Sequence, residues 1–458
     1  MRKLCLAGIL ISLFAGMAWA GPYEKYYQNL PVPMNEPMLP TIPEYTVQLT
    51  DFGGVGDGVT DNTEAFTKAI SALNKKGGGH LVVTAGIFVT GPIVLKDRID
   101  LHLERNAMIL LTPDRERHLK NGKAQPGISA SKRSDISITG QGIIDGNGEW
   151  WRGVKRSKVS DTEWNAYKRM GGTITPKGDL WYPFDLKAFP NVADTYEAQE
   201  KIRTHLVRFT DCERVLLRGV TLQNSPKFHF VPQRCQDVVI DGLTVRCMWN
   251  AQNGDGIDPS QCRNVLIVNN TVDVGDDGIC LKGGAGAAGA KNGPCENILI
   301  QDNTVFHAHG GFVIGSEFCG GMENIIVRHN TFSGTDTGLR FKSAPERGGK
   351  TSGIRISDIY MTDIKDEAIV FQCDYADRPA GRENNQAAVS ESFIPDFGDI
   401  AMERIVCRGC ATGIRAQGEL RMIHDITVKD ATIFYNEKAT DIADPQMIRL
   451  DNVRLESF

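Results

Sequence analysis

The feature that most restricts the fold of this chain is a short apolar segment that recurs along it. Each copy has seven residues, is rich in Val, Leu and Ile, and ends in Thr: Val215–Thr221, Val238–Thr244, Val265–Thr271, Ile298–Thr304, Ile325–Thr331 and Ile426–Thr432. The first five begin 23, 27, 33 and 27 residues apart. Because the unit returns in the same order with variable loops and no helical period between copies, it predicts an all-β parallel β-helix rather than a βαβ sheet or an antiparallel sandwich.

A second short strand in each coil predicts which side chains face the core. It opens at Gly256, Gly278, Gly311, Gly338, Ala368 and Gly413. Side chains alternate between the two faces of a strand. The predicted inward set is Ile257, Pro259, Ile279, Leu281, Phe312, Ile314, Leu339, Phe341, Ile369, Phe371, Ile414 and Ala416. The outward set, which shares one outer surface, includes Asp258, Lys282, Arg340 and Lys342.

One amphipathic helix precedes the strands, from about Asp61 to Asn74. We expect Asp61 to cap it, with Glu64 three residues on completing a capping box. Its apolar face consists of Phe66, Ala69, Ile70 and Leu73. Such a helix suits an N-terminal cap over the open end of a stacked core. Residues 21–458 are therefore expected to form a single β-helix domain.

Two segments without the repeat, about 146–202 and 374–398, are expected to be insertions that wall a cleft. The first holds Trp150, Trp151, Trp164 and Trp181 and predicts a helix near 160–170. Aromatic clusters in insertions pack more often than they bind ligands, so we expect packing.

Residues 1–20 have the layout of a secretory leader and are excluded from the fold. Arg2 and Lys3 precede a short apolar stretch, and small residues lead up to Ala20. The apolar run is short for a bilayer span, so we expect export to the periplasm or the extracellular space and no membrane span. Export permits disulfides among the ten cysteines that follow, of which Cys407 and Cys410 are the closest pair, although the pairing is not readable. No second Cys-x-x-Cys and no His-x-x-x-His occurs, so we expect disulfides or plain burial rather than zinc binding.

The net charge of the chain indicates which classes of ligand it could bind. The formal net charge is −5, and −7 without Arg2 and Lys3. There is no general basic surface for nucleic acid, so an anionic ligand would have to be held by local Arg and Lys. We expect a monomer.

Alignment on the glycines that open the second strand predicts a cluster of polar side chains. Asp255 and Asp277 directly precede Gly256 and Gly278, and should stack in adjacent coils about 4.8 Å apart. One position earlier, the alignment places Asp276, His309 and Asp336 in successive coils. Taken singly, these residues are more often turn formers or surface groups than catalysts. Their common register predicts a site, with Lys282, Arg340 and Lys342 beside it.

The predicted cluster suits glycoside cleavage of an acidic sugar. Close carboxylates raise the pKa of one of them, so that a protonated acid and an ionised base coexist. Glycosidases use such a pair, one carboxyl protonating the leaving oxygen and the other activating water or attacking the sugar. Arg and Lys beside them would bind a sugar carboxylate. The residues thus indicate a uronic-acid polymer as substrate.

The chain resembles the polygalacturonases, the pectin-hydrolysing glycoside hydrolases of family 28. The family's Asn-Thr-Asp motif matches Asn253–Asp255, its paired aspartates Asp276 and Asp277, its Gly-His-Gly motif Ala308–Gly310, and its Arg-Ile-Lys motif Arg340–Lys342. Further similar stretches are 51–58, 138–146 and 224–226. The departures are Gly254 for Thr, Ala308 for Gly and Phe341 for Ile; the last is an inward position.

This resemblance implies a right-handed β-helix and hydrolysis of polygalacturonate, pectin or oligogalacturonides with inversion, without metal or other cofactor. It implies that Asp276 is the general acid, that Asp255 and Asp277 position and deprotonate the water, and that His309 supports the acid. Substrate binding is expected from Arg340, Lys342, Lys282, Asp258, Glu317 and Arg347. Glu317 and Arg347 lie in stretches, 315–317 and 347–349, that look like variants seen in exo-acting members, so exo action is expected.

Two other functions remain open from the residues alone. A pectate-lyase-like eliminase would use clustered aspartates to bind Ca²⁺ and an Arg or Lys as base. A β-helical adhesin would bind an acidic glycan without cutting it.

Overall fold

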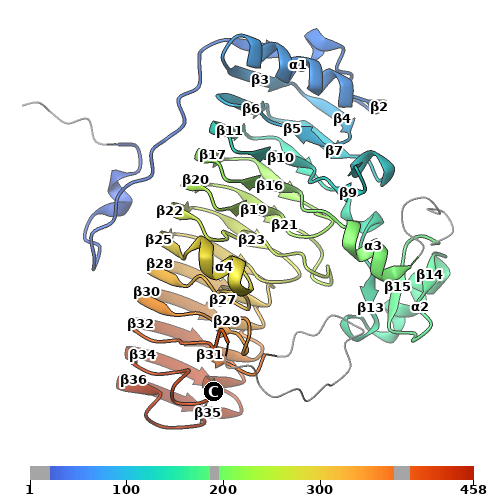
Figure 1. The fold of residues 1–458 in the computed structure, drawn as a ribbon. Coiled ribbons are helices and arrows are strands. Elements are labelled where there is room, and N and C mark those ends of the chain that lie inside the picture. The colour runs from blue at the N-terminus through green and yellow to red at the C-terminus, as the bar shows by residue number, and fades with distance from the viewer. Residues whose placement is uncertain (1–20, 186–194, 376–391, 458) are drawn as a thin grey trace, which may run out of the picture.

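The computed structural model describes residues 21–185, 195–375 and 392–457 and shows a right-handed parallel β-helix (Figure 1). The predicted leader, 1–20, and most of the second predicted insertion, 376–391, lie outside the described residues. None of the helices in the described part of the chain is long and apolar enough to cross a membrane.

The recurrent apolar segments form one continuous column of strands, as predicted. Val215 pairs in register with Val238, and that column continues through Val265, Ile298 and Ile325. The strands are β1 (Thr46–Gln48), β3 (Gly79–Val83), β6 (Ile99–Leu103), β11 (Ser134–Gly140), β17 (Glu213–Arg218), β20 (Gln236–Asp241), β22 (Arg263–Val268), β25 (Cys295–Gln301), β28 (Met322–Ser333), β30 (Thr351–Thr362), β32 (Ile400–Arg408), β34 (Ile426–Tyr435) and β36 (Ile448–Ser457).

A second column begins after the corner of each coil. Its strands are β2 (Asp57–Asp61), β4 (Gly86–Thr90), β7 (Ala107–Leu111), β12 (Ile143–Asp145), β18 (Thr221–Gln223), β21 (Thr244–Arg246), β23 (Thr271–Asp273) and β26 (Thr304–Phe306), after which the long strands from β28 onward span both columns.

The third column carries the glycine-opened strands. It runs through β5 (Ile93–Val94), β10 (Ile128–Ser131), β16 (Val207–Thr210), β19 (Phe230–Gln233), β24 (Ile279–Leu281), β27 (Gly310–Gly315), β29 (Thr337–Lys342), β31 (Glu367–Gln372), β33 (Thr412–Gln417) and β35 (Lys438–Ile442). Single bridges at Ile257 and Ser260 join β19 to β24. All of the predicted inward side chains except Pro259 join the main hydrophobic core, whereas the buried Cys280, Val313 and Val370 of the outward parity do not, so the predicted alternation is confirmed.

The repeated Asn-Thr pair at the end of the apolar segments forms a buried ladder of amides. Nδ2 of Asn270 donates to Oδ1 of Asn303 at 2.8 Å, and Nδ2 of Asn303 donates to Oδ1 of Asn330 at 3.0 Å. Each of the three also donates to a backbone carbonyl, which compensates for burying a polar side chain. This ladder stabilises the register of three of the coils that carry the predicted site, those of Asp276, His309 and Asp336.

The N-terminal helix α1 (Thr63–Lys75) covers the top of the first coils (Figure 1). Its predicted apolar face is buried. The predicted capping box is wrong, because Asn62 occupies the cap position and turns its side chain to the backbone of Val55, Thr60 and Val89. Asp61 accepts instead from the Thr63 backbone N–H. Glu64 pairs with Lys68 one turn along.

The first predicted insertion folds into a small unit of its own beside the middle coils (Figure 1). Its elements are β13 (Val154–Lys155), a 3-10 turn (Arg156–Lys158), α2 (Asp161–Arg169), β14 (Thr173–Ile174), β15 (Leu180–Tyr182) and α3 (Tyr196–Ile202). Trp164 and Trp181 pack with Val159 in its core, so the expected helix and the expected packing role are both confirmed for these two tryptophans.

All ten cysteines of the described residues carry free thiols. Cys212, Cys235 and Cys262 follow one another on successive coils inside the core. The contact with Cys235 and burial raise the pKa of Cys212. The contact with Cys212 lowers the pKa of Cys235, but Cys262 and burial outweigh it and raise that pKa. These groups behave as small core residues, and the disulfides that export would permit are not formed in this structure.

Candidate active site

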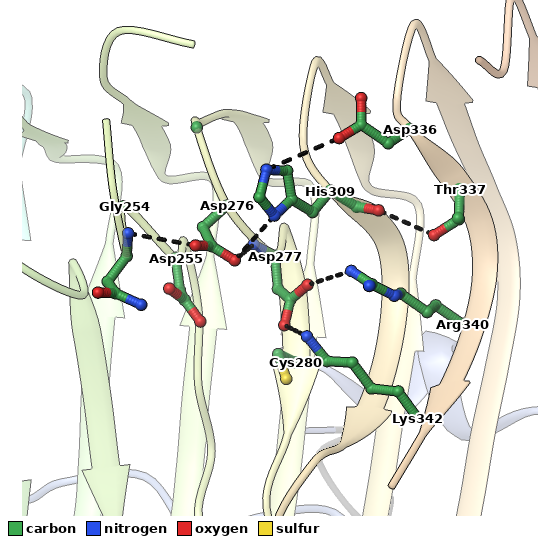
Figure 2. A network of polar contacts seen from close by, with 12 residues as sticks. Gly254, Asp255, Asp276, Asp277, Cys280, His309, Asp336, Thr337, Arg340 and Lys342 are labelled. Carbon is green, nitrogen blue, oxygen red and sulfur yellow. Dashed lines mark hydrogen bonds and ion pairs between the residues drawn. The ribbon is translucent and has the colours of Figure 1, made fainter. Parts of the chain in front are cut away.

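The register of the third column brings the predicted site residues together. Ile257 pairs with Ile279, Ile279 with Phe312, and Phe312 with Leu339. This register sets Asp255 level with Asp277, as predicted. It also places Asp276, His309 and Asp336 in one row across three coils (Figure 2).

The turn that carries Asp255 is held tightly by its neighbours. Asn253 adopts a left-handed φ of 51°, and its N–H donates to Oδ2 of Asp276 at 3.2 Å. A Cβ at Gly254 would lie 2.8 Å from Sγ of Cys247 and 3.1 Å from Cβ of Ala251. A side chain at position 254 would therefore displace Cys247 or Ala251, which explains glycine at this point of the motif.

Three carboxylates form the centre of the site (Figure 2). One oxygen from each of Asp255, Asp276 and Asp277 lies within 4.8 Å of the others. Oδ2 of Asp277 accepts from Nζ of Lys342 at 2.7 Å, and Oδ1 of Asp277 lies 3.4 Å from Nη1 of Arg340. Lys342 and Arg340 thus already neutralise Asp277, which weakens the attraction of this cluster for a divalent cation.

Asp276 has a different set of partners. Its Oδ1 accepts from the Asp277 backbone N–H at 3.0 Å and lies 3.2 Å from Nδ1 of His309. Its side chain is partly exposed, whereas Asp255 and Asp277 are almost completely buried. Asp276 is therefore the carboxylate of the three that solvent or a ligand reaches most easily.

The electrostatic environment separates the carboxylates into two kinds. Burial, with Asp276 and Asp258 nearby, raises the pKa of Asp255 well above its usual value. Burial acts in the same direction on Asp276 and Asp277, but the hydrogen bond between His309 and Asp276 and the charges of nearby Lys and Arg side chains outweigh it. His309, Lys342 and Lys158 lower the pKa of Asp276, and Lys342 with Arg340 lowers the pKa of Asp277. Of the three carboxyls in the free site, Asp255 thus binds a proton most readily. The family resemblance instead gives the role of proton donor to Asp276.

Asp258 and Lys282 lie side by side below the three carboxylates. They share the predicted outward parity, but Asp258 is fully buried and so lies on no open surface. Nζ of Lys282 lies 3.6 Å from Asp258 and 3.9 Å from Asp255, and it donates to the Gly315 carbonyl at 3.2 Å. Burial raises the pKa of Asp258 to about 7.

Three residues that the sequence patterns did not predict also shape the site. Nζ of Lys158, in the first insertion, lies 3.2 Å from Nε2 of His309. Arg203, just after α3, donates to Oδ1 of Asn253 at 2.8 Å. The ring of Tyr375 lies 5.6 Å from the Arg340 guanidinium and 5.1 Å from Nζ of Lys342. All three lie in or next to segments without the repeat, where no register exists from which to align them.

A polar groove of about 470 Å³ continues from His309 and Arg340 along the later coils. Its walls include Asp336, Thr337, Asp366, Glu367, Thr412, Arg415 and Glu437. Arg415 pairs with Glu367 at 3.0 Å.

Glu317 and Arg347 lie in the loops after β27 and β29, at the opposite ends of these strands from the aspartates. The Glu317 carbonyl accepts from the Gly283 N–H at 3.0 Å, next to Lys282. Nη1 of Arg347 donates to Oγ of Ser316 at 3.4 Å. Their predicted substrate contacts stay predictions.

Comparison with known proteins agrees with this fold. Residues 125–446 match the model of the glycosyl hydrolases family 28. The chain is 29% identical to an exo-poly-alpha-D-galacturonosidase of Dickeya chrysanthemi over 76% of its length, and 28% identical to a probable polygalacturonase of Vitis vinifera over 70%. It spans only 60% and 62% of the length of these two relatives.

Among solved structures, the chain resembles an exopolygalacturonase of Thermotoga maritima, with a TM-score of 0.76 and 30% identity, over 92% of this chain and 94% of that one. The family match covers well over half of the chain and includes the whole carboxylate cluster. The protein therefore belongs to family 28 of the glycosyl hydrolases.

Proposed function

We propose that this protein hydrolyses α-1,4-galacturonosyl linkages in polygalacturonate or pectin. The observation that carries the proposal is the contact between the clustered carboxylates and three buried or partly buried cations, Arg340, Lys342 and Lys282. The carboxylates supply acid and base chemistry. The names of the similar proteins from Dickeya chrysanthemi and Thermotoga maritima support this substrate.

The proposed roles follow the motif. Asp276, the most accessible carboxyl, protonates the leaving oxygen, while Asp255 and Asp277 hold and deprotonate water. Hydrolysis requires a proton on Asp276, although its surroundings lower its pKa. An imidazolium at His309 would hold Asp276 ionised, so catalysis needs His309 neutral when the substrate is bound.

Recognition of the sugar carboxylate is assigned to Arg340 and Lys342. Both contact Asp277 in the free site, and Arg340 does so only at 3.4 Å. Its remaining guanidinium N–H groups are available for a bidentate contact with a galacturonate carboxylate. The groove beyond His309 would hold further sugar units.

Inversion and exo action are the finer parts of the proposal. The nearest carboxylate oxygens lie within 4.8 Å, less than the roughly 6.5–9.5 Å between the carboxyl groups of inverting enzymes. Inversion therefore rests on the family resemblance alone. Exo action is supported by the names of the Dickeya chrysanthemi and Thermotoga maritima proteins, and by the predicted role of the loops at Glu317 and Arg347.

The experiment that tests the proposal is product analysis from polygalacturonate. We expect galacturonate monomer from the first minutes onward, with the β-anomer as the first NMR signal because the bond cleaved is α. A ladder of oligomers would replace exo with endo action, and the α-anomer would refute inversion. Products with a conjugated double bond, which absorb in the ultraviolet, and loss of activity in chelator would instead indicate an eliminase.

The matched variant is Asp276→Asn. It should lower the release of reducing sugar by at least about 1,000-fold while substrate binding, measured by calorimetry, changes little, because the amide cannot donate a proton. Binding without any cleavage by the wild-type protein would instead support an adhesin.

Export and a monomeric state complete the proposal. Both rest on the sequence, and fractionation of the native host together with light scattering of the purified protein tests them.

A further inference from the structure

Lys158 reaches the candidate active site from outside the β-helix. It ends the 3-10 turn Arg156–Lys158 of the first insertion. Its Nζ donates to the Gly275 carbonyl at 3.1 Å and lies 3.2 Å from Nε2 of His309. Gly275 directly precedes Asp276, so one ammonium group connects the turn of the aspartate to the histidine beside it.

The chemistry of the contact determines where the imidazole proton lies. An ammonium group has only donors, so Nε2 of His309 must accept from it. The proton of the neutral ring is then on Nδ1, which lies 3.2 Å from Oδ1 of Asp276 and donates to it. Because the lone pair of Nε2 accepts from Lys158, it is not available to bind a second proton.

The other charged groups that face the ring do not compete with this arrangement. Oδ2 of Asp336 lies 3.7 Å from Nε2, beyond hydrogen-bond distance, and Asp336 pairs with Lys365 at 2.9 Å. The His309 backbone is held by its N–H to the Asp276 carbonyl and by the Thr337 hydroxyl, which donates to the His309 carbonyl. The ring is therefore fixed between Lys158 and Asp276.

We infer that Lys158 is a positioning residue that selects the Nδ1–H form of His309 and thereby keeps on Asp276 the proton that the two side chains would otherwise share. This inference rests on the proposed function, in which Asp276 is the acid. Its physical basis is distance. The ammonium lies 3.2 Å from Nε2 of His309 but makes no ion pair with Asp276, so although it also lowers the pKa of Asp276, it disfavours an imidazolium more strongly, and the proton of the pair resides on the carboxyl. Burial lowers the pKa of Lys158, yet Asp276 and Asp336 act to keep it charged.

Removal of the ammonium has a defined consequence for the pH profile. In Lys158→Met the proton of the pair moves to His309, and the fraction of molecules with a protonated Asp276 falls. We expect kcat to fall about tenfold or more, with a much smaller change in KM. Because one positive charge is lost, the pair holds its proton to higher pH, so the alkaline limb of the kcat profile should move up by about one pH unit. A purely structural defect would lower kcat without this shift.

The experiment uses the full-length protein with Lys158→Met, the conservative variant Lys158→Arg, and Lys168→Met as a control on the exposed end of the same insertion. Lys158→Arg should retain the pH profile of the wild type, since it keeps a cation with donors only. Lys168→Met should match the wild type in every measurement. An unchanged alkaline limb in Lys158→Met would overturn the inference.

A second measurement does not depend on activity. Two-bond ¹⁵N–¹H correlation spectra of the protein labelled at histidine, with His309 assigned from a His309→Gln sample, distinguish the two ring nitrogens. We expect neutral Nδ1–H in the wild type and an imidazolium or Nε2–H in Lys158→Met at the same pH. An Nε2–H ring in the wild type would overturn the inference even if Lys158→Met does not fold. A wild-type protein inactive on every pectic polymer would refute the proposed function, whereas the NMR result would still decide the tautomer.

Discussion

The buried carboxyl of Asp258 makes the stability of this protein depend on pH in a predictable way. Asp258 is fully buried, neither of its oxygens accepts a hydrogen bond from the described residues, and its pKa is raised from 3.8 to about 7. A shift of about three pKa units corresponds to about 4 kcal/mol.

The direction of this pH dependence follows from the pH at which the unfolded and the folded chain each lose the Asp258 proton. As pH rises above 3.8 the unfolded chain ionises at Asp258, while the folded chain keeps its proton until about pH 7. The free energy of unfolding therefore falls from pH 4 to about pH 7 and this contribution is constant above that. The penalty at pH 8 is about 4 kcal/mol, against less than about 1 kcal/mol at pH 4.

Asp258→Asn should remove the penalty, because an amide does not ionise. We expect the variant to be more stable than the wild type at pH 8 by about 3 kcal/mol, and equal to it or slightly less stable at pH 4. Lys282 loses one partner but retains Asp255 at 3.9 Å and the Gly315 carbonyl at 3.2 Å.

Urea unfolding of Asp258→Asn and of the wild type at pH 4 and pH 8 measures the effect. At each pH, subtracting the unfolding free energy of the wild type from that of the variant cancels the contribution of the other titrating groups. Asp114→Asn, at a half-exposed side chain, controls for the loss of one negative charge. The reasoning is refuted if the difference in unfolding free energy between Asp258→Asn and the wild type is the same at both pH values to within about 1 kcal/mol.

Two further predictions concern the buried contacts that hold the site. Lys342→Met removes the 2.7 Å partner of a buried carboxylate and should destabilise the protein by about 3–5 kcal/mol, measured by urea unfolding. The double variant with Asp277→Asn should recover part of that loss, and a double variant that is no more stable than Lys342→Met alone would contradict the ion-pair explanation. Asn303→Ala interrupts the amide ladder and removes the oxygen that accepts from both the side-chain and the backbone N–H of the buried Asn270, which should cost about 3 kcal/mol. Asn436→Ala, at an exposed asparagine outside the ladder whose φ is not left-handed, should change stability by less than about 0.5 kcal/mol, and equal losses from the two asparagine variants would argue against the ladder.

Much of the site was predictable because a β-helix converts sequence period into position. Each coil rises by one strand spacing, so residues at the same distance from the opening glycine must stack. That rule alone placed Asp255 over Asp277, aligned His309 with Asp276, and assigned Phe341 to the core. The alternation of side chains likewise predicted Arg340 and Lys342 on the same face.

The capping box of the N-terminal helix shows where local pattern is insufficient. Asp61 and Glu64 have the right spacing, but Asn62 is buried against the backbone of three other residues and takes the cap position. A tertiary contact that satisfies a buried side chain outweighs a local hydrogen bond that solvent could replace.

The sequence by itself determined the coil register, the core side chains and the identity of the clustered carboxylates, since all of these follow from periodicity. Only the tertiary structure decided how the cluster is covered and charged. Lys158 contacts His309 across 151 residues of sequence from an insertion without a repeat. The burial of Asp258 and the separation of the aspartate pKa values depend on which side chains exclude water from each carboxyl, and burial of that kind has no period along the chain.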